Sequence, residues 1–248
     1  MTIKAIDLFA GLGGMTQGAT AAGVRVVWAA NHWPEAVETH ARNHPETNHA
    51  CQDLQQANWA QVPAHDLLLA SPCCQGHSRA RGKDKTHHDS SRSTAWAVVS
   101  AAEMHKPGVF IVENVAEFME WRLFGVWREA MSALGYSIAP HVLDAADFGV
   151  PQNRRRMFLV GTRSKHPIKL KLGTREHQAI RPFIDWDGPW KWSIVRDKSE
   201  NTRKRVAKGR EQLKSSRFLA PFYGSGSGLS GRSLDRPVGT LTTRDRWL

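Results

Sequence analysis

Cysteine and long apolar runs are both scarce in this chain of 248 residues. It holds three cysteines, none of them in a Cys-x-x-Cys pair, which argues against a disulfide framework or a zinc ribbon and fits a reducing compartment. No run of about 18 apolar residues exists, and the first apolar run carries charge. We therefore expect neither a membrane-spanning helix nor a cleaved signal peptide, and a cytoplasmic protein without a membrane partner.

Negative charge is also in short supply. The chain carries 34 Lys and Arg against 23 Asp and Glu, a net charge of +11. The segment 191–217 alone holds ten basic and three acidic residues, a local net charge of +7. Such a segment suits contact with phosphates, although a solvated helix face has the same composition. The charge therefore predicts a polyanionic partner without naming it.

Short runs rich in Val, Ile and Leu recur along the chain and alternate with segments of helical periodicity. This alternation predicts an α/β fold with a mostly parallel sheet that helices cover on both faces. The pattern stops after Gly161, so we place a domain boundary near 162–165. Strands are expected at 3–9, 24–30, 66–70, 108–112, 137–143 and 156–161, and helices at 34–44, 92–106 and 122–134.

Residues suited to chemistry follow several of these strands. The first strand ends in "DLFAGLGG" (7–14), a glycine-rich turn that lets backbone approach a ligand, although a turn required only for packing would read the same way. Asp53, the adjacent Cys73 and Cys74, and Glu113 come after later apolar segments. Because ligands of open α/β sheets bind at the carboxyl ends of the strands, these residues predict one site on that edge.

Five short segments follow one another along the chain: "DLFAGLGG" (7–14), "SPCCQGHS" (71–78), "ENV" (113–115), "FGVPQNRRR" (148–156) and "RPVGTLTTRDRW" (236–247). In this order they resemble the motifs of the DNA cytosine-5 methyltransferases. The resemblance implies a Rossmann-like methyltransferase domain at 1–163 and a smaller, incomplete target-recognition region at 164–248. It also implies S-adenosyl-L-methionine as methyl donor, with S-adenosyl-L-homocysteine as product, no metal, and double-stranded DNA as partner.

The resemblance implies a catalytic set. Cys74 would add to C6 of a flipped-out cytosine, since it precedes glutamine as in the family's Pro-Pro-Cys-Gln motif. Cys73 stands where the family has its second proline, and it is the alternative nucleophile. Glu113 would hold or protonate N3, Arg156 would contact O2, and Arg154 would support them.

The resemblance also implies binding residues. The family's usual Asn-Glu-Trp reads Asn-His-Trp here, so His32 lacks the permanent charge of the glutamate, and Trp33 either packs on adenine or belongs to the core. The loop 76–91 is expected to close over DNA. Cofactor contacts are expected from Phe9, Gly11, Gly13, Gly14, His32, Trp33, Asp53, Pro72 and Trp96. DNA contacts are expected from Gln75, Ser78, Arg79, Arg81, Lys83 and Arg244.

Two features leave alternatives open. The histidines of "HARNHPETNHAC" (40–51) have no standard metal-ligand spacing, so we expect them to be solvent-exposed. The family's last motif does not occur before Leu248, which predicts a truncated product or one subunit of a split enzyme, weakly active without a complementing C-terminal fragment. Besides a DNA methyltransferase of a modification system, a tRNA cytosine-5 methyltransferase and a non-catalytic DNA-binding or regulatory subunit fit the sequence.

Overall fold

The computed structural model describes residues 2–73, 94–189, 194–221 and 231–241. The chain divides into two compact units. The first comprises Met1–Val142 and Arg156–Lys171, and the second Leu143–Arg155 and Leu172–Leu248. The expected functional division at 163/164 stays a prediction, because it concerns the roles of the two regions rather than their packing.

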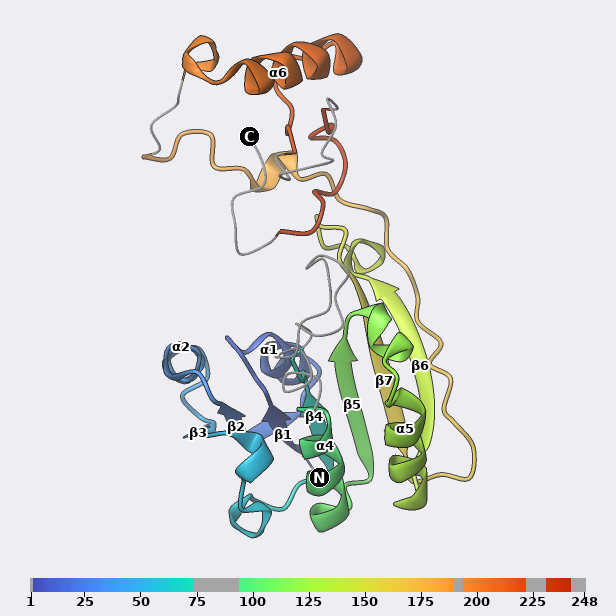
Figure 1. The fold of residues 1–248 in the computed structure, drawn as a ribbon. Helices are drawn as coiled ribbons and strands as arrows, with labels where there is room; N and C mark the ends of the chain where they lie inside the picture. Colours follow the sequence, from blue (N-terminus) through green and yellow to red (C-terminus); the bar gives the residue numbers. More distant parts are fainter. Residues whose placement is uncertain (1, 74–93, 190–193, 222–230, 242–248) are drawn as a thin grey trace. The chain divides into compact units, whose positions relative to one another are not determined.

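The first unit is built on a seven-stranded sheet with the order β3-β2-β1-β4-β5-β7-β6 (Figure 1). The pairings among β1 to β5 are parallel, whereas β7 runs antiparallel to β5. The predicted α/β class and mostly parallel sheet are therefore confirmed, and the short strand β3 is an addition. The strands are β1 Lys4–Leu8, β2 Arg25–Asn31, β3 Asn48–Cys51, β4 Leu67–Ala70, β5 Val109–Asn114, β6 Ser137–Asp144 and β7 Arg155–Thr162.

Helices pack on the two faces of this sheet. Side chains alternate along β1, so Ile6 and Leu8 join the larger core cluster with residues of α4 and α5, while Ala5 joins a second cluster with Met15 and Ala19 of α1. The helices are α1 Gly14–Ala21, α2 Pro34–Asn43, α4 Trp96–His105 and α5 Phe124–Ala133. Short 3₁₀ helices are η1 Leu54–Gln56, η2 Trp59–Gln61, η4 Ala116–Glu120, η5 Ala145–Phe148, η6 Arg181–Phe183 and η7 Val195–Asp197.

Aromatic rings fill the core beside β5. Phe110 and Phe118 meet the ring of Trp127 edge-on, and all three side chains are fully buried. The indole nitrogen of Trp127 donates a hydrogen bond to the carbonyl of Ala95 at 3.0 Å, which satisfies its polar end. A Cβ on Gly161 of β7 would overlap the Phe110 ring, so glycine is required there. This packing holds β7 next to β5. The predicted site residues Glu113 and Arg156 lie on these two strands.

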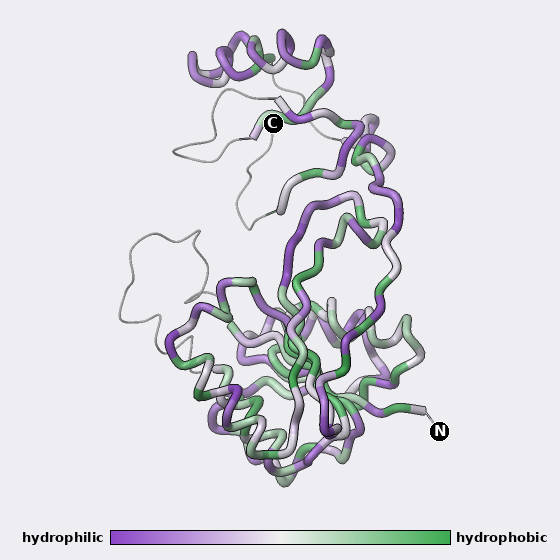
Figure 2. The backbone as a smooth tube through the Cα atoms, turned by 90° about the vertical axis from the view of Figure 1, so that its right-hand side faces the viewer, coloured by the Kyte–Doolittle hydropathy of each residue, from purple (hydrophilic) through white to green (hydrophobic). Residues whose placement is uncertain are grey.

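The second unit relies on loops and hydrogen bonds more than on regular elements. Ser199 caps the N-terminus of its helix α6 (Glu200–Leu213). The Ser199 hydroxyl accepts a hydrogen bond from the backbone N–H of Thr202 at 3.4 Å. Figure 2 shows α6 largely in the hydrophilic colour. Throughout the described ranges, no helix combines the length and apolar character that crossing a membrane requires.

Candidate active site

The turn between β1 and α1 adopts an unusual backbone conformation. Phe9, Gly11 and Gly13 have φ angles of 58°, 55° and 99°, in the left-handed region. For Phe9 this costs about 1–3 kcal/mol, and such strain concentrates at ligand sites. A Cβ on Gly13 would lie 2.6 Å from His44 Nε2, whereas one on Gly11 or Gly14 would meet nothing within 4 Å. Gly13 is thus needed for packing, while the backbone at Gly11 and Gly14 stays open to a ligand.

A chain of buried polar groups lies beneath this turn. Thr16 Oγ1 lies 2.8 Å from Asp7 Oδ2 and 3.1 Å from His40 Nε2, and His40 Nδ1 lies 2.8 Å from His49 Nε2. Burial raises the pKa of the Asp7 carboxyl to about 7. Burial, with a smaller contribution from His49 and His44, lowers the pKa of His40 to about 4. The network therefore favours a neutral carboxyl and a neutral imidazole.

The expectation of solvent-exposed histidines is wrong for His40, which is only 1% exposed. Its ring is enclosed because Thr16 and His49 satisfy both nitrogens. Sequence reasoning also missed Asp7 and Thr16. The available signal was an aspartate inside the apolar run "IKAIDLF", a strand expected to be buried on both faces.

Residues after β2 and β3 occupy the same edge of the sheet as the glycine turn, since β1, β2 and β3 are parallel neighbours. Trp33 is 53% exposed, so it does not belong to the hydrophobic core. Its backbone N–H donates a hydrogen bond to Asn31 Oδ1 at 3.0 Å. His32 is also exposed. Asp53 is exposed and caps η1 by accepting a hydrogen bond from the Gln55 N–H at 3.0 Å. These residues offer an aromatic face and hydrogen-bonding groups to a ligand.

The ends of β4 and β5 are joined by a buried asparagine. Asn114 Nδ2 donates to the carbonyl of Pro72 at 3.0 Å, and Asn114 Oδ1 accepts from the Val115 N–H at 2.9 Å. The Cys73 N–H donates to Thr94 Oγ1 at 3.1 Å. The segment before residue 74 is therefore hydrogen-bonded to Asn114, which immediately follows Glu113 at the end of β5. It is also hydrogen-bonded to Thr94.

The remaining predicted residues lie partly inside and partly outside the described ranges. Trp96 is partly buried at the start of α4, with its ring centroid 6.4 Å from that of Trp121. The half-buried Cys73 is a free thiol. Outside the described residues lie the predicted nucleophile and all six predicted DNA contacts: Cys74, Gln75, Ser78, Arg79, Arg81, Lys83 and Arg244.

Glu113 and Arg156 form an ion pair at the carboxyl end of β5. Arg156 Nε lies 3.1 Å from Glu113 Oε1, and the two side chains are only 19% and 22% exposed. The antiparallel pairing of β5 with β7 brings them together, since Glu113 lies opposite Phe158. Arg155 is exposed, as strand alternation predicts for the residue between the two motif arginines. The site thus contains a carboxylate whose orientation a guanidinium fixes.

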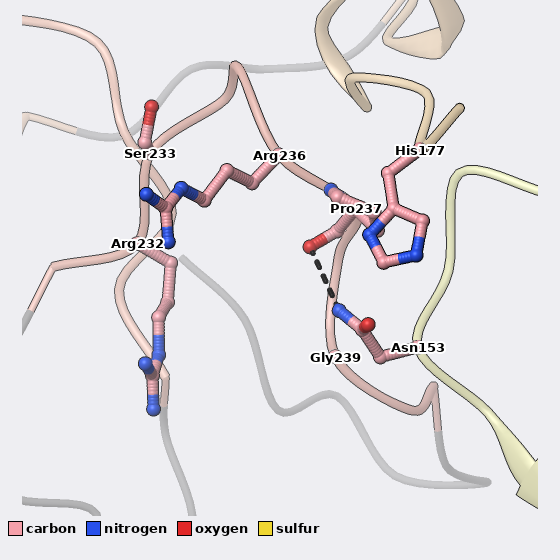
Figure 3. Close-up of a pocket in the computed structure, with 7 residues that line it drawn as sticks. All are labelled: Asn153, His177, Arg232, Ser233, Arg236, Pro237 and Gly239. Carbon is pink, nitrogen blue, oxygen red and sulfur yellow. Dashed lines mark hydrogen bonds between the residues drawn. The ribbon is translucent and has the colours of Figure 1, made fainter. Parts of the chain in front are cut away.

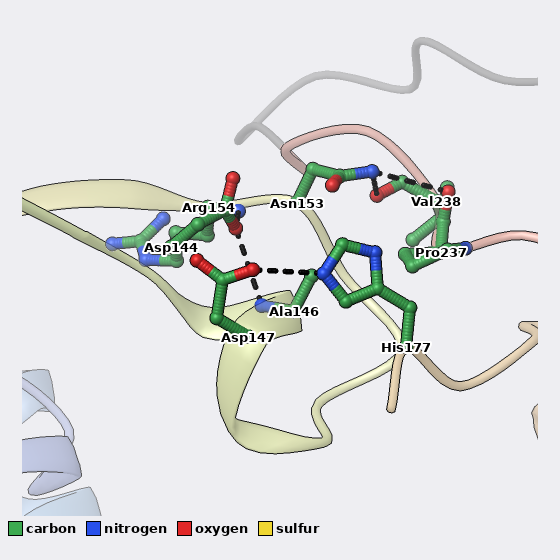
Figure 4. Close-up of polar contacts among 8 residues, drawn as sticks. All are labelled: Asp144, Ala146, Asp147, Asn153, Arg154, His177, Pro237 and Val238. Carbon is green, nitrogen blue, oxygen red and sulfur yellow. Dashed lines mark hydrogen bonds and ion pairs between the residues drawn. The ribbon is translucent and has the colours of Figure 1, made fainter. Parts of the chain in front are cut away.

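Arg154 belongs to the second unit, where its backbone is held by Asp144 (Figure 4). Asp144 Oδ1 accepts hydrogen bonds from the Arg154 N–H at 2.8 Å and from the Ala146 N–H at 3.2 Å. The neighbouring Asn153 donates from Nδ2 to the carbonyl of Pro237 at 3.3 Å. Asn153 and Arg154 of the motif are therefore held by hydrogen bonds to two different segments of this unit.

The fold and these residues define a class: a doubly wound α/β protein with a glycine-rich ligand turn after its first strand and a positioned carboxylate at the end of β5. The family follows from the comparison with known proteins. The model of the C-5 cytosine-specific DNA methylases matches residues 3–216, and the chain belongs to this family.

Individual relatives agree with this assignment. The chain is 36% identical over 163 residues to the type II methyltransferase M.NlaX of Neisseria lactamica, covering 64% of this chain and 51% of the relative. It is 33% identical over 185 residues to the type II methyltransferase M.HhaI of Haemophilus parahaemolyticus, covering 73% and 54%. A structure of Spodoptera frugiperda DNMT2 shares the fold, with a TM-score of 0.64, 20% identity, and coverage of 84% and 66%. The chain thus spans about half the length of these two curated relatives.

Proposed function

We propose that the chain carries the catalytic part of a DNA cytosine-5 methyltransferase of a modification system, acting on a cytosine flipped out of double-stranded DNA. The supporting observation is the Glu113–Arg156 ion pair, next to the hydrogen bond from Asn114 to Pro72. Cys74 follows Pro72 by two residues, so a nucleophile, a carboxylate and a guanidinium can converge on one base. The family's cytosine chemistry requires this combination.

The residues after β1, β2 and β3 fit S-adenosyl-L-methionine. The open backbone at Gly11 and Gly14 and the strained Phe9 suit close approach of a ligand, and the exposed Trp33 can stack on its adenine. Asp53 and His32 can accept or donate hydrogen bonds to the adenine and ribose, and Gly13, Pro72 and Trp96 shape the surrounding wall. When bound, the cofactor supplies an electrophilic methyl group from its sulfonium, leaving S-adenosyl-L-homocysteine; no metal is needed.

The roles of the side chains follow from the reactivity of cytosine. A thiolate at Cys74 adds to C6, and the electron pair of the C5–C6 double bond becomes available at C5. Glu113, once protonated, donates a hydrogen bond or its proton to N3, so charge does not build up on the ring, while Arg156 contacts O2 with support from Arg154. C5 takes the methyl group, then a base removes the C5 proton and the thiolate leaves from C6, restoring the aromatic ring.

Phosphate contacts would come from the loop that follows the nucleophile and from the end of the chain. Flipping a base costs a few kcal/mol of stacking and pairing, which contacts on both strands must offset. We assign this role to Gln75, Ser78, Arg79, Arg81, Lys83 and Arg244. The predicted complementing C-terminal fragment stays a prediction.

Transfer of a radiolabelled methyl group from S-adenosyl-L-methionine tests the proposal. Duplex DNA of mixed sequence is expected to take up label, and tRNA is not. Label in tRNA alone would support the RNA-directed alternative. Binding of DNA without any labelling, even with the C-terminal half of a relative added, would indicate a non-catalytic subunit.

A trapping experiment identifies the nucleophile. Duplex DNA containing 5-fluorocytosine should form a stable covalent adduct, because the fluorine at C5 cannot leave as a proton does. We expect the adduct to survive in Cys73→Ser and to disappear in Cys74→Ser. The reverse result would assign the nucleophile to Cys73.

A further inference from the structure

A cavity of the second unit is not used by the mechanism above. It has a volume of about 440 Å³, and its polar lining comes from Asn153, His177, Arg232, Ser233 and Arg236 (Figure 3). Pro237 and Gly239 complete the wall. All of these residues belong to the same compact unit, so the cavity is a feature of that unit alone.

The cavity carries net positive charge. Within the described ranges, no carboxylate pairs with the guanidinium of Arg232 or Arg236. The acidic neighbours are already engaged: Asp235 Oδ1 lies 2.9 Å from Arg181 Nε, and Asp147 Oδ1 lies 2.8 Å from His177 Nε2. Among the described residues, both guanidinium groups, each with a planar set of N–H donors, therefore remain for a ligand rich in anionic oxygens.

The backbone that bears the two arginines is fixed on two sides. The carbonyls of Leu234 and Arg236 accept hydrogen bonds from the N–H groups of Arg181 and Ile180, both at 3.1 Å. On the other side, the carbonyl of Val238 accepts from the Asn153 N–H at 2.8 Å. Binding an anion therefore requires ordering of side chains only, which lowers its entropic cost.

We propose that this cavity binds a backbone phosphate of the duplex DNA substrate. Asn153 forms part of the cavity wall and immediately precedes Arg154, which the resemblance places among the residues that support the reaction. A phosphate diester, with its anionic oxygens, suits the two guanidinium groups of Arg232 and Arg236. The inference rests on the proposed function in naming DNA as the ligand, and it adds a binding subsite to it.

The salt dependence of DNA binding tests this proposal without knowledge of the recognised sequence. Fluorescence anisotropy of a labelled 30-base-pair duplex would be measured over a series of KCl concentrations. The slope of log K against log [salt] is negative, and each lost phosphate contact reduces its magnitude by about 1. Because both arginines are assigned to one phosphate, Arg232→Gln with Arg236→Gln should reduce the magnitude of the slope by about 1 and weaken binding by about tenfold per arginine.

The matched control is Arg25→Gln with Arg42→Gln, which removes the same charge from exposed positions of the first unit. This control should leave the slope almost unchanged, and Arg232→Lys with Arg236→Lys should keep most of it. An equal loss in the control pair, or no loss in the cavity pair, would overturn the subsite. So would a slope change seen with tRNA but not with duplex DNA.

Failure of the proposed function gives a different result. If the unaltered chain binds no duplex at any salt concentration, the DNA substrate itself is wrong, and the subsite falls with it. If the unaltered chain binds and labels DNA while the cavity variants match it in slope, only the subsite is wrong. Thermal unfolding of each variant checks that the second unit stays folded.

Discussion

The two compact units place their charged groups in contrasting surroundings. In the first unit, Asp7 and His40 are buried inside the sheet and helix layers, and the Glu113–Arg156 pair is only about one-fifth exposed. In the second unit, the Arg181–Asp235 pair has side chains 44% and 67% exposed, and the helix α6 is charged along most of its length.

This contrast separates two uses of charge. Burial makes the energy of an ionisable group depend strongly on its partners, so a few residues in the first unit can control chemistry and stability. Exposed charges interact weakly with one another and remain available to a polyanion. Under the proposed function, the first unit would hold and transform a base, and the second would contact the DNA backbone. The following experiments can break or sharpen that distinction.

The largest effect is expected from Glu113→Gln. The amide keeps the shape of the side chain but cannot donate a proton to N3, and it loses the ion pair with Arg156. We expect kcat/KM for methyl transfer to fall by about 10³-fold, within the range of a lost general acid. Glu103→Gln, an exposed position of α4, is the control and should not change the rate. Equal rates for both variants would show that the buried pair has no catalytic role.

A second prediction concerns pH and stability in the Asp7–Thr16–His40 network. The Asp7 carboxyl has an ordinary pKa of 3.8 and a folded value of about 7, so its contribution to stability falls as pH rises through this range. His40 has an ordinary pKa of 6.5 and a folded value of about 4, so its contribution falls as pH drops from 6.5 to 4. The two contributions oppose each other between about pH 4 and 6.5.

Single variants should reveal each contribution. Relative to the unaltered chain, the unfolding free energy of Asp7→Asn should rise by about 1.4 kcal/mol per pH unit from pH 4 to 7. His40→Gln should show a trend of similar size and opposite sign between pH 4 and 6.5. Urea unfolding at several pH values measures both. Parallel curves for both variants and the unaltered chain would mean that neither group is perturbed by burial.

Asn114→Ala should produce a smaller loss. The variant removes the hydrogen bond to the Pro72 carbonyl and leaves that buried oxygen unpaired, at a cost of about 1–3 kcal/mol of stability. Because Asn114 positions the segment before Cys74 and Pro72 forms only part of the cofactor wall, the rate of adduct formation with 5-fluorocytosine DNA should fall by a larger factor than the S-adenosyl-L-methionine affinity. A loss of affinity equal to the loss of rate would point to general unfolding instead.

Sequence patterns predicted most of the first unit because its elements depend on local periodicity. Apolar runs identified six of the seven strands, and the exception, β3, has only the four residues Asn48–Cys51 and little apolar character. The glycine turn and Glu113 could be read from residue type and position after a strand. The pairing of Glu113 with Arg156 could not, because it depends on the antiparallel insertion of β7 beside β5.

The structure of the second unit was harder to predict from the sequence, and the reason is physical. Its segments are joined by backbone hydrogen bonds between distant loops, as between Asn153 and Val238, and such bonds leave no periodic signal in side chains. The composition of the basic segment 191–217 fits a phosphate-contacting surface or a solvated helix face, and α6 forms a helix within it. The cavity formed with Arg232 and Arg236 was not predicted, because it requires three separate stretches of chain to meet.

The smallest effect on the free energy of unfolding is expected from the removal of exposed ion pairs, one in each unit. Lys208 Nζ lies 2.9 Å from Glu211 Oε2 on α6, with side chains 54% and 71% exposed. Lys208→Gln should change the free energy of unfolding by less than about 0.5 kcal/mol, since solvent screens such pairs. Arg42→Gln, which removes the exposed pair with Glu38 in the first unit, should have an equally small effect. A loss above about 1 kcal/mol for Lys208→Gln alone would mean that charges hold the second unit together, and the separation of roles between the units would fail.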